Sequence, residues 1–230
     1  GFGPMEQTIH QGRRWSTANA YLRPALKRGN VRIVNGLARR VTIENQRATG
    51  VEIDVKNQIQ VVRARREVIL AASSINSPKL LLLSGIGPAE HLRQNGIAVV
   101  ADRPGVGRNL QDHIEISLIY QLNGPHSYDK YKKLHWKAAA GLNYALFRGG
   151  PASSNLIEGG AFWWGNRGEV TPDMQYIFVV GAGIEEGIEA VPGGNGCTLN
   201  LGQIRPRSRG EVRLASNDPA AFPRIVPRYF

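Results

Sequence analysis

A short apolar run followed at once by small and polar residues constrains the fold of this chain more than any other feature. Residues 67–71 read Glu-Val-Ile-Leu-Ala, and residues 72–77 are mostly small or polar. Such a run is typical of a strand buried on both faces of a layered α/β sheet. Ser77 and Pro78 suit the N-cap and the first position of a helix. The sequence therefore predicts a strand, a turn and a helix that begins at residue 78 and includes the leucines 80–83.

The residues on either side of this unit alternate between strand and helix signals. Ser16 and Thr17 favour the start of a short helix. Polar turns at 44–47 and 56–57 separate runs rich in β-branched residues, which indicates an antiparallel meander. The strands predicted in this part of the chain are 31–34, 37–44, 50–55, 58–64 and 96–100, and a further helix is predicted over 89–94.

The pattern of predicted helices and strands changes near residues 104–115. Beyond this point a helix is predicted over 131–147, with Leu134, Ala138, Leu142 and Ala145 near one face. The strands predicted beyond it are 114–122, 156–164, 173–180, 196–204 and 210–214. Strands without long helices between them favour an antiparallel sheet, so residues 104–115 are the predicted domain boundary.

Charge and cysteine content narrow the functional classes. The 29 lysines and arginines outnumber the 18 acidic residues, for a formal net charge of +11. Residues 1–70 hold 13 basic and 5 acidic residues, which leaves a nucleic-acid-binding module as a remote alternative. Basic tracts such as 63–66 and 130–133 are short and have few aromatic neighbours in sequence, which argues against a stacking platform. The single cysteine, Cys197, excludes an internal disulfide and a cysteine-cluster zinc site.

No complete catalytic motif is present in these 230 residues. The three Gly-x-Gly steps, which begin at residues 1, 85 and 105, lack the third glycine of a dinucleotide fingerprint. The histidines form no zinc-binding pattern, and the Gly-x-Ser-x-Gly elbow of hydrolases is absent. Asp112 and His113 are adjacent, but neighbours on a strand point to opposite faces, so a structural role is favoured for them. We therefore assign no catalytic residue and no metal ligand.

Residues 73–87 carry the most specific pattern. They read Ser-Ser-Ile-Asn-Ser-Pro-Lys-Leu-Leu-Leu-Leu-Ser-Gly-Ile-Gly, and this run resembles the second signature of the glucose–methanol–choline (GMC) oxidoreductases. Further similar stretches follow the same order along the family: 12–18, 47–52, 104–113, 172–176, 206–212 and 216–219. Residues 1–10 and 111–115 are most similar to the choline dehydrogenase branch.

The resemblance implies an α/β (α+β) fold. Residues 15–113 would be part of an FAD-binding Rossmann-like domain, and 114–230 part of a substrate-binding domain with an antiparallel sheet. Residues 1–14 would form a loop on the substrate side. The implied reaction is oxidation of the CH–OH group of a primary alcohol by hydride transfer to flavin.

The resemblance also implies site residues. Ala38, Ala72 and Ser73 would approach the FAD through their backbone, although the family usually has glycine where Ser73 stands. Glu115 would face the trimethylammonium group of a choline-type substrate, and Trp163 or Trp164 would add cation–π attraction, with core packing as the alternative for both.

The same resemblance leaves several alternatives open. The family's dinucleotide fingerprint and catalytic histidine have no counterpart in this sequence, so we expect a central fragment that is inactive alone. An aliphatic or polyether alcohol is the alternative substrate to choline. The expected partners are a small-molecule alcohol and an electron acceptor of unknown kind, with no nucleic acid and with a homo-oligomer as an option. No apolar run is long enough to span a membrane, which leaves a cytoplasmic or a peripherally membrane-associated protein.

Overall fold

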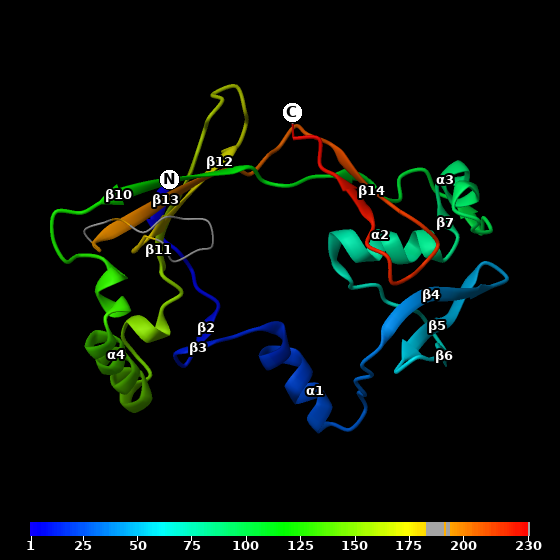
Figure 1. The fold of residues 1–230 in the computed structure, drawn as a ribbon, viewed down its shortest axis with the longest axis horizontal. Helices are drawn as coiled ribbons and strands as arrows, with labels where there is room; N and C mark the ends of the chain where they lie inside the picture. Colours follow the sequence, from blue (N-terminus) through cyan, green and yellow to red (C-terminus); the bar gives the residue numbers. More distant parts are fainter. Residues whose placement is uncertain (183–190, 192–193, 230) are drawn as a thin grey trace. The chain divides into compact units, whose positions relative to one another are not determined.

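The computed structural model describes residues 1–182, 191 and 194–229, and the chain divides into two compact units (Figure 1). Unit 1 consists of Gly1–Arg32 and His113–Pro206, and unit 2 of Ile33–Asp112 and Arg207–Phe230. This division differs from the segmentation expected from the sequence. Residues 15–32 belong to unit 1, and 207–229 return to unit 2, where their strands find hydrogen-bonding partners.

Unit 2 begins with the predicted meander. Strands β4 (Leu37–Glu44), β5 (Arg47–Val55) and β6 (Gln58–Arg63) pair antiparallel in that order. Both connecting turns hold two consecutive residues at positive φ, at 45–46 and at 56–57. Two-residue turns of this kind match the twist of paired strands, and the meander prediction is confirmed.

Helix α2 (Ser73–Leu83) starts earlier than predicted. Ser77 does not act as its N-cap, because the Ser77 hydroxyl oxygen accepts a hydrogen bond from the backbone N–H of Ala72 at 3.0 Å. Pro78 consequently lies inside the helix. The helix ends as expected at Ser84, and Gly85 follows with φ +80°, a backbone conformation that glycine adopts at little cost.

A leucine cluster forms the core of unit 2. The predicted helix α3 (Ala89–Gln94) is confirmed, and it follows β7 (Ile86–Gly87). The buried members of the cluster are Leu82, Leu83, Leu92 and Leu214. The strand predicted over 96–100 is wrong, because Ile97 packs against this cluster and pairing with β7 begins only at β8 (Ala101–Asp102).

Two further strand predictions in unit 2 are wrong. Residues 31–34 and 67–71 pair with no strand among the described residues. Ile33 is 53% exposed and Ile69 is 78% exposed. An apolar run becomes a strand only where its backbone N–H and C=O groups find partners, and here both runs lack them within the described part of the chain.

The C-terminal residues complete unit 2. Strand β14 (Gly210–Arg213) pairs antiparallel with β15 (Arg224–Val226) on one side and β9 (Arg108–Leu110) on the other. The strand predicted over 210–214 is thus confirmed, but it belongs to a different sheet from the strands that precede it. Leu214, just beyond β14, reaches the leucine cluster.

Unit 1 is built on an antiparallel sheet, as predicted, and this sheet has five strands. Its order is β1-β11-β12-β13-β10. The strands are β1 (Phe2–Pro4), β10 (Glu115–Gln121), β11 (Ile157–Trp163), β12 (Met174–Val179) and β13 (Gly196–Gln203). The four longer strands fall within the predicted ranges, and the N-terminal residues supply an edge strand.

Short elements surround this sheet. They are β2 (Ile9–His10), β3 (Arg13–Arg14), a π-helical turn η1 (Ala18–Leu22), α1 (Arg23–Lys27), the 3-10 turns η2 (Tyr128–Lys132) and η3 (Pro151–Ser153), and α4 (Leu134–Phe147). The Ser16 hydroxyl accepts from the N–H of Asn19 at 3.4 Å, which supports the predicted helix start. Among the described residues, no helix has the length and apolar composition needed to cross a bilayer.

A buried carboxylate anchors η2 to the sheet. Asp129 accepts hydrogen bonds from the N–H groups of Gly196 at 2.7 Å and Ala182 at 3.3 Å, and it pairs with Lys132 at 2.7 Å. Burial raises the pKa of Asp129, but the hydrogen bonds from Lys132 and the two N–H groups outweigh it and leave the pKa lowered. The carboxylate is therefore held in its charged form.

Candidate functional site

A pocket of about 230 Å³ in unit 2 brings together two of the residues expected to approach the cofactor. Ala38 of β4 and Ala72, the residue before α2, both line it. The other lining residues are Leu37, Asn76, Lys79, Leu80, Leu83 and Pro219. Ser73 is not among them, although it follows Ala72 directly. A space of this size takes one ring system of a cofactor rather than a whole dinucleotide.

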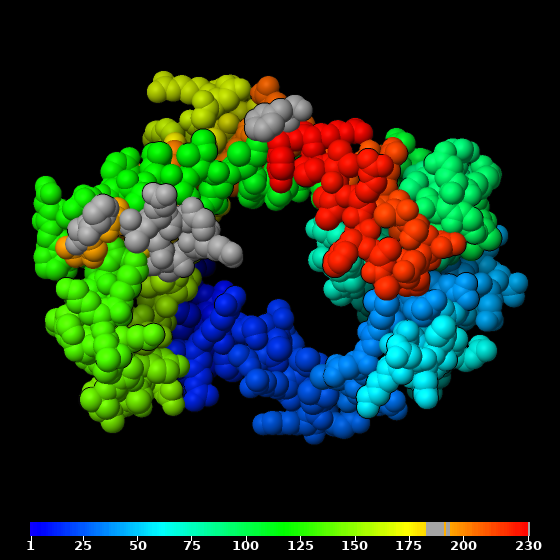
Figure 2. Space-filling view, in the orientation of Figure 1, coloured from blue at the N-terminus to red at the C-terminus, as the bar shows by residue number. Residues whose placement is uncertain are grey.

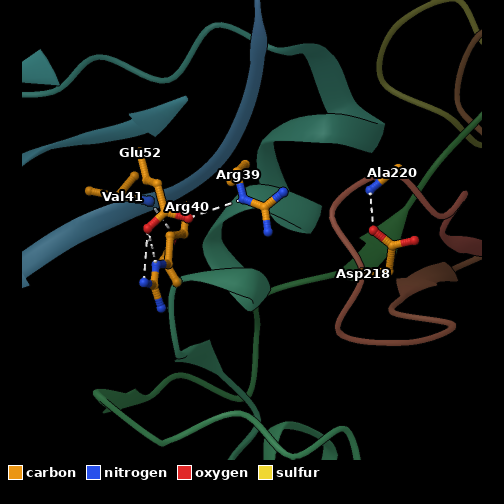
Figure 3. Close-up of polar contacts among 7 residues, drawn as sticks. Arg39, Arg40, Val41, Glu52, Asp218 and Ala220 are labelled. Atoms are coloured by element: carbon orange, nitrogen blue, oxygen red, sulfur yellow. Dashed lines mark hydrogen bonds and ion pairs between the residues drawn. The ribbon is translucent and has the colours of Figure 1, made fainter. Parts of the chain in front are cut away.

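An irregularity in the β4–β5 ladder shapes the strand at this pocket. The register shifts between Ala38 and Arg40, and an extra residue of this kind bends a strand and redirects its side chains. Arg39 and Arg40 consequently reach the same carboxylate, that of Glu52, at 3.1 and 2.9 Å (Figure 3). On a regular strand these neighbouring arginines would point to opposite faces. The shared carboxylate thus holds the backbone of β4 next to Ala38.

A buried hydroxyl ties β4 to helix α2. The backbone N–H of Val41 donates to the Ser84 hydroxyl at 2.8 Å, and that hydroxyl donates to the carbonyl of Leu80. Ser84 is 7% exposed. Because a buried N–H without an acceptor is costly, this contact fixes the strand against the helix.

Helix α2 begins without a side-chain cap. Its N-cap residue is Ala72, which makes no side-chain hydrogen bond to the first turn. The first residue, Ser73, has φ +66°, a left-handed conformation that costs a non-glycine residue about 1–2 kcal/mol. A helix start with small residues and unsatisfied N–H groups lets a negatively charged or polar ligand approach the backbone.

Lys79 closes the pocket rather than offering a charge to it. Its ammonium group donates to the carbonyls of Pro219 and Ala221, both at 2.7 Å. The loop that carries these carbonyls is further held by Asp218, which accepts from the N–H of Ala220 at 2.9 Å (Figure 3). The C-terminal loop is therefore attached to α2 beside Ala72.

These features fit part of a nucleotide cofactor. Alanine at 38 and at 72 leaves both backbones accessible, and the leucines at 80 and 83 supply an apolar wall. The helix N-terminus adds a positive dipole end. Such a mixture of apolar walls with few backbone donors is typical of cofactor pockets.

Glu115 lies in unit 1, at the first position of β10. Strand pairing places it opposite Gly202, then Gln175, then Phe162, so the four residues share one face of the sheet. A Cβ added at Gly202 would lie 3.9 Å from the Glu115 carboxylate. Glu115 is exposed, and its carboxylate is therefore accessible to a cationic ligand.

The register corrects the expectation for Trp163. Trp163 pairs with Met174, one position beyond the Phe162–Gln175 pair, so its ring lies on the face opposite to Glu115. Trp164 follows the strand, and its indole N–H donates to the carbonyl of Glu169 at 3.0 Å. Phe162, which is 43% exposed, is the aromatic residue in the row of Glu115.

Asp112, which precedes His113, contacts the C-terminal end of the described chain. Asp112 accepts a hydrogen bond from the Tyr229 hydroxyl at 2.6 Å, and this bond raises the pKa of the tyrosine. Asp112 and His113 belong to different units. The structural role favoured from sequence agrees with this contact.

Sequence reasoning missed several residues of the pocket in unit 2. Asn76, Lys79, Leu80 and Leu83 follow Ala72 at intervals of four, seven, eight and eleven residues, which is one face of a helix. This signal was available once α2 was known to start at Ser73. Pro219 carried no such signal, because its place depends on the return of the C-terminal residues to unit 2.

Comparisons with known proteins agree with the resemblance. The GMC oxidoreductase family profile matches residues 1–115. The oxygen-dependent choline dehydrogenase of Brucella ovis is 50% identical over 229 residues, which is 100% of this chain and 42% of the relative. The chain thus spans less than half the length of such relatives.

Solved structures show the same architecture. An arginine variant of Aspergillus oryzae RIB40 formate oxidase, studied for its effect on FAD modification, matches with a TM-score of 0.86 and 26% identity over 97% of this chain and 43% of that one. Pyridoxine 4-oxidase from Mesorbium loti matches with a TM-score of 0.78 and 28% identity over 100% of this chain and 41% of that one. The mixed fold with an antiparallel sheet is therefore confirmed.

Proposed function

The chain belongs to the GMC oxidoreductase family, and from this premise we propose that it is part of an FAD-dependent oxidoreductase that oxidises a primary alcohol of the choline type. The observation that carries the proposal is the pocket lined by both Ala38 and Ala72. These two residues are distant in sequence, and the family resemblance assigns both to the cofactor. The identity to a choline dehydrogenase supports the choice of substrate.

Unit 2 would bind the FAD. Bound there, FAD would supply the acceptor for the hydride that leaves the alcohol carbon. The backbone next to Ala38, held by the Arg39–Glu52–Arg40 contacts, would border the nucleotide. Ala72 and Ser73, with their small side chains, would let the cofactor approach the start of α2, and Lys79 would keep the C-terminal loop in place.

Unit 1 would select the alcohol. The Glu115 carboxylate would attract a fixed positive charge, and this attraction grows as water is excluded from the site. Gly202 leaves room beside the carboxylate, and Phe162 adds an aromatic ring to the same face. A neutral alcohol would gain nothing from Glu115.

Oxidation of the alcohol also releases a proton from its hydroxyl group. We assign this proton to no residue of the chain, because the family's catalytic histidine has no counterpart in this sequence. We therefore propose that these 230 residues show no turnover alone. Turnover of choline by the isolated chain with FAD and an electron acceptor would contradict this part of the proposal.

The intact enzyme tests the proposal. Choline added without oxygen should bleach the absorption of the bound flavin, whereas aliphatic and polyether alcohols should do so only at much higher concentration. Ala38→Leu would fill the pocket and should lower the FAD content of the purified protein. Ala215→Leu, at an exposed alanine of unit 2, is the matched control. Normal FAD content in Ala38→Leu would contradict the assignment of this pocket.

A further inference from the structure

Unit 1 contains a cavity of about 730 Å³ whose lining includes none of the residues assigned to the cofactor or to the alcohol. Its walls come from two segments, 8–17 near the N-terminus and 144–155 at the end of α4 and beyond. Figure 2 shows the blue N-terminal residues next to the yellow-green residues of the second segment. A cavity of this size is in the range that holds a small organic molecule. We call it the hairpin pocket, because the β2–β3 hairpin borders it.

A two-residue turn holds this hairpin against the end of α4. Gln11 and Gly12 both have positive φ, at 51° and 68°, which is the conformation of a tight hairpin turn. A Cβ at Gly12 would clash with the carbonyl oxygen of Arg148, the C-cap residue of α4. Glycine allows this close approach, so the turn fixes the hairpin at the edge of the pocket.

The pairing register of the hairpin decides which side chains enter the pocket. Ile9 pairs with Arg14, and His10 pairs with Arg13, so each pair shares one face of the hairpin. Ile9 and Arg14 line the pocket, whereas His10 and Arg13 do not. Trp15 also lines it, with its ring 4.7 Å from the ring of His10. Consecutive residues thus supply a guanidinium group and an indole ring to the same wall.

Polar side chains of the pocket have unused hydrogen-bonding capacity. Within the part of the chain that the structure describes, the Arg14 guanidinium makes no ion pair and no hydrogen bond. The hydroxyl groups of Thr8, Thr17 and Tyr144, which also line the pocket, have no partner there either. The Ser154 hydroxyl, in contrast, donates to the carboxylate of Glu158 at 2.7 Å. One guanidinium group and three hydroxyl groups in one cavity can together bind an oxyanion.

The two segments of sequence that form the pocket carry charge of one sign. Residues 7–32 hold six lysines and arginines and no acidic residue, and residues 130–157 hold five and none. Every lining residue of the pocket belongs to one of these segments. Of the basic residues, Lys132 pairs with Asp129, and the Arg148 guanidinium lies 5.1 Å from the ring of Tyr144. Such a cavity attracts anions, which is the opposite of the preference expected at Glu115.

We propose that the hairpin pocket binds an organic anion that carries a planar ring. The carboxylate or phosphate group of this ligand would pair with Arg14 and accept hydrogen bonds from the hydroxyl groups of Thr17 and Tyr144. Its ring would lie against Trp15 and Ile9. The cavity is much larger than a bare inorganic anion needs, and Trp15 is 38% exposed, so an organic ligand is favoured over an inorganic one. Because the alcohol is not involved, binding can be tested without turnover.

Isothermal titration calorimetry of the intact, FAD-loaded enzyme with benzoate and with phenyl phosphate tests this site. Both anions should bind, whereas phenol and inorganic phosphate should bind at least about tenfold more weakly, and high salt should weaken the binding of both anions. Arg14→Gln should lower both affinities at least about tenfold, because it removes a charge-assisted hydrogen bond. Arg13→Gln, on the opposite face of the same hairpin, is the matched control and should bind as the wild type does. Trp15→Leu should weaken the binding of phenyl phosphate but not that of inorganic phosphate.

Tighter binding of phenyl phosphate than of benzoate would support a phosphate ligand, and the reverse would support a carboxylate. Four results would overturn the proposal. The first is a wild-type enzyme that binds neither anion, and the second is equal affinity for phenyl phosphate and inorganic phosphate. The third is an equal loss of affinity in Arg14→Gln and Arg13→Gln, which would indicate an effect of net charge alone. The fourth is a melting temperature of Arg14→Gln well below that of Arg13→Gln, which would indicate that Arg14 already pairs with a carboxylate of the intact protein.

Discussion

The two units bury different kinds of side chain. In unit 2 the buried apolar residues include large aliphatic ones, such as Leu80, Leu82, Leu83 and Leu92. In unit 1 the buried apolar residues of the described chain are small, Ala140, Val179, Ala182 and Cys197. Buried polar groups are concentrated there as well, namely Ser127, Asp129, Asp173, Thr198 and Asn200.

This difference shows where each unit obtains its stability. Burial of large aliphatic side chains stabilises unit 2 through the hydrophobic effect. Unit 1 depends more on hydrogen bonds such as those of Asp129, while large apolar residues on α4 and on β10 face solvent. Substitutions in the two units should therefore differ in size and in kind.

The largest effect is expected from the core of unit 2. Leu92 is 0% exposed, so Leu92→Ala should lower the free energy of unfolding by about 2–5 kcal/mol through the lost burial and the cavity left behind. Leu142→Ala on α4 is the matched change in unit 1 and should stay within about 0.5 kcal/mol. Urea denaturation of the intact protein measures both. Equal losses of unfolding free energy in the two variants would contradict the difference inferred between the units.

The next effect is expected at the buried carboxylate of unit 1. Asp129→Ala would leave the N–H groups of Gly196 and Ala182 without their acceptor and should cost about 1–3 kcal/mol. Asp218→Ala, at an exposed turn, should cost much less. Because the pKa of Asp129 is lowered by its hydrogen bonds, its contribution is present above the ordinary carboxyl pKa and is lost as the pH falls through the lowered pKa. An Asp129→Ala variant as stable as the wild type at neutral pH would contradict the anchoring role of Asp129.

A smaller, stabilising effect is expected at the start of α2. Ser73→Gly should relieve the left-handed backbone and raise the free energy of unfolding by about 0.5–1 kcal/mol. Ser74→Gly is the control, because Ser74 has no positive φ and glycine should destabilise the helix there. Thermal unfolding of both variants shows the difference. A loss of stability in Ser73→Gly would contradict the strain inferred at this residue.

The smallest effect is expected from a half-buried imidazole in unit 2. The Nε2 atom of His91 accepts from the N–H of Leu214 at 3.1 Å. Burial and then the nearby Arg213 lower the pKa of His91, and Glu211 opposes them. The unfolded chain therefore binds the proton more readily, so stability is full above the ordinary histidine pKa of about 6.5 and falls with pH below it. His91→Gln should flatten this part of the pH profile, and an unchanged profile would exclude His91 as its source.

The long strands of unit 1 and the meander of unit 2 were predictable because alternating and β-branched residues report directly on pairing. The failures share one physical cause. Residues 31–34 and 67–71 are rich in apolar residues, but no strand of the described chain supplies partners for their backbone N–H and C=O groups. The prediction that a helix begins at Pro78 was also wrong. Helix α2 begins at Ser73 and contains Pro78, and the Ser77 hydroxyl accepts a hydrogen bond from the N–H of Ala72.

Only part of the candidate site could be predicted from the sequence. Ala38 and Ala72 came from the family resemblance, and their shared pocket became visible only once strand and helix were placed. Whether Glu115 and Trp163 lie on the same face of the sheet could be decided only from the pairing register, because a shift of one position along a strand moves a side chain to the other face.

The proposed division of labour between a cofactor-binding unit 2 and a substrate-selecting unit 1 rests most directly on Glu115. The measurement is kcat/KM of the intact enzyme for choline and for its neutral carbon isostere, dimethylbutanol, in wild type and in Glu115→Gln. The account predicts at least about a tenfold loss for choline, equivalent to about 1.4 kcal/mol, with little change for the isostere and with normal FAD content. Equal losses for both alcohols, or no loss for choline, would contradict it.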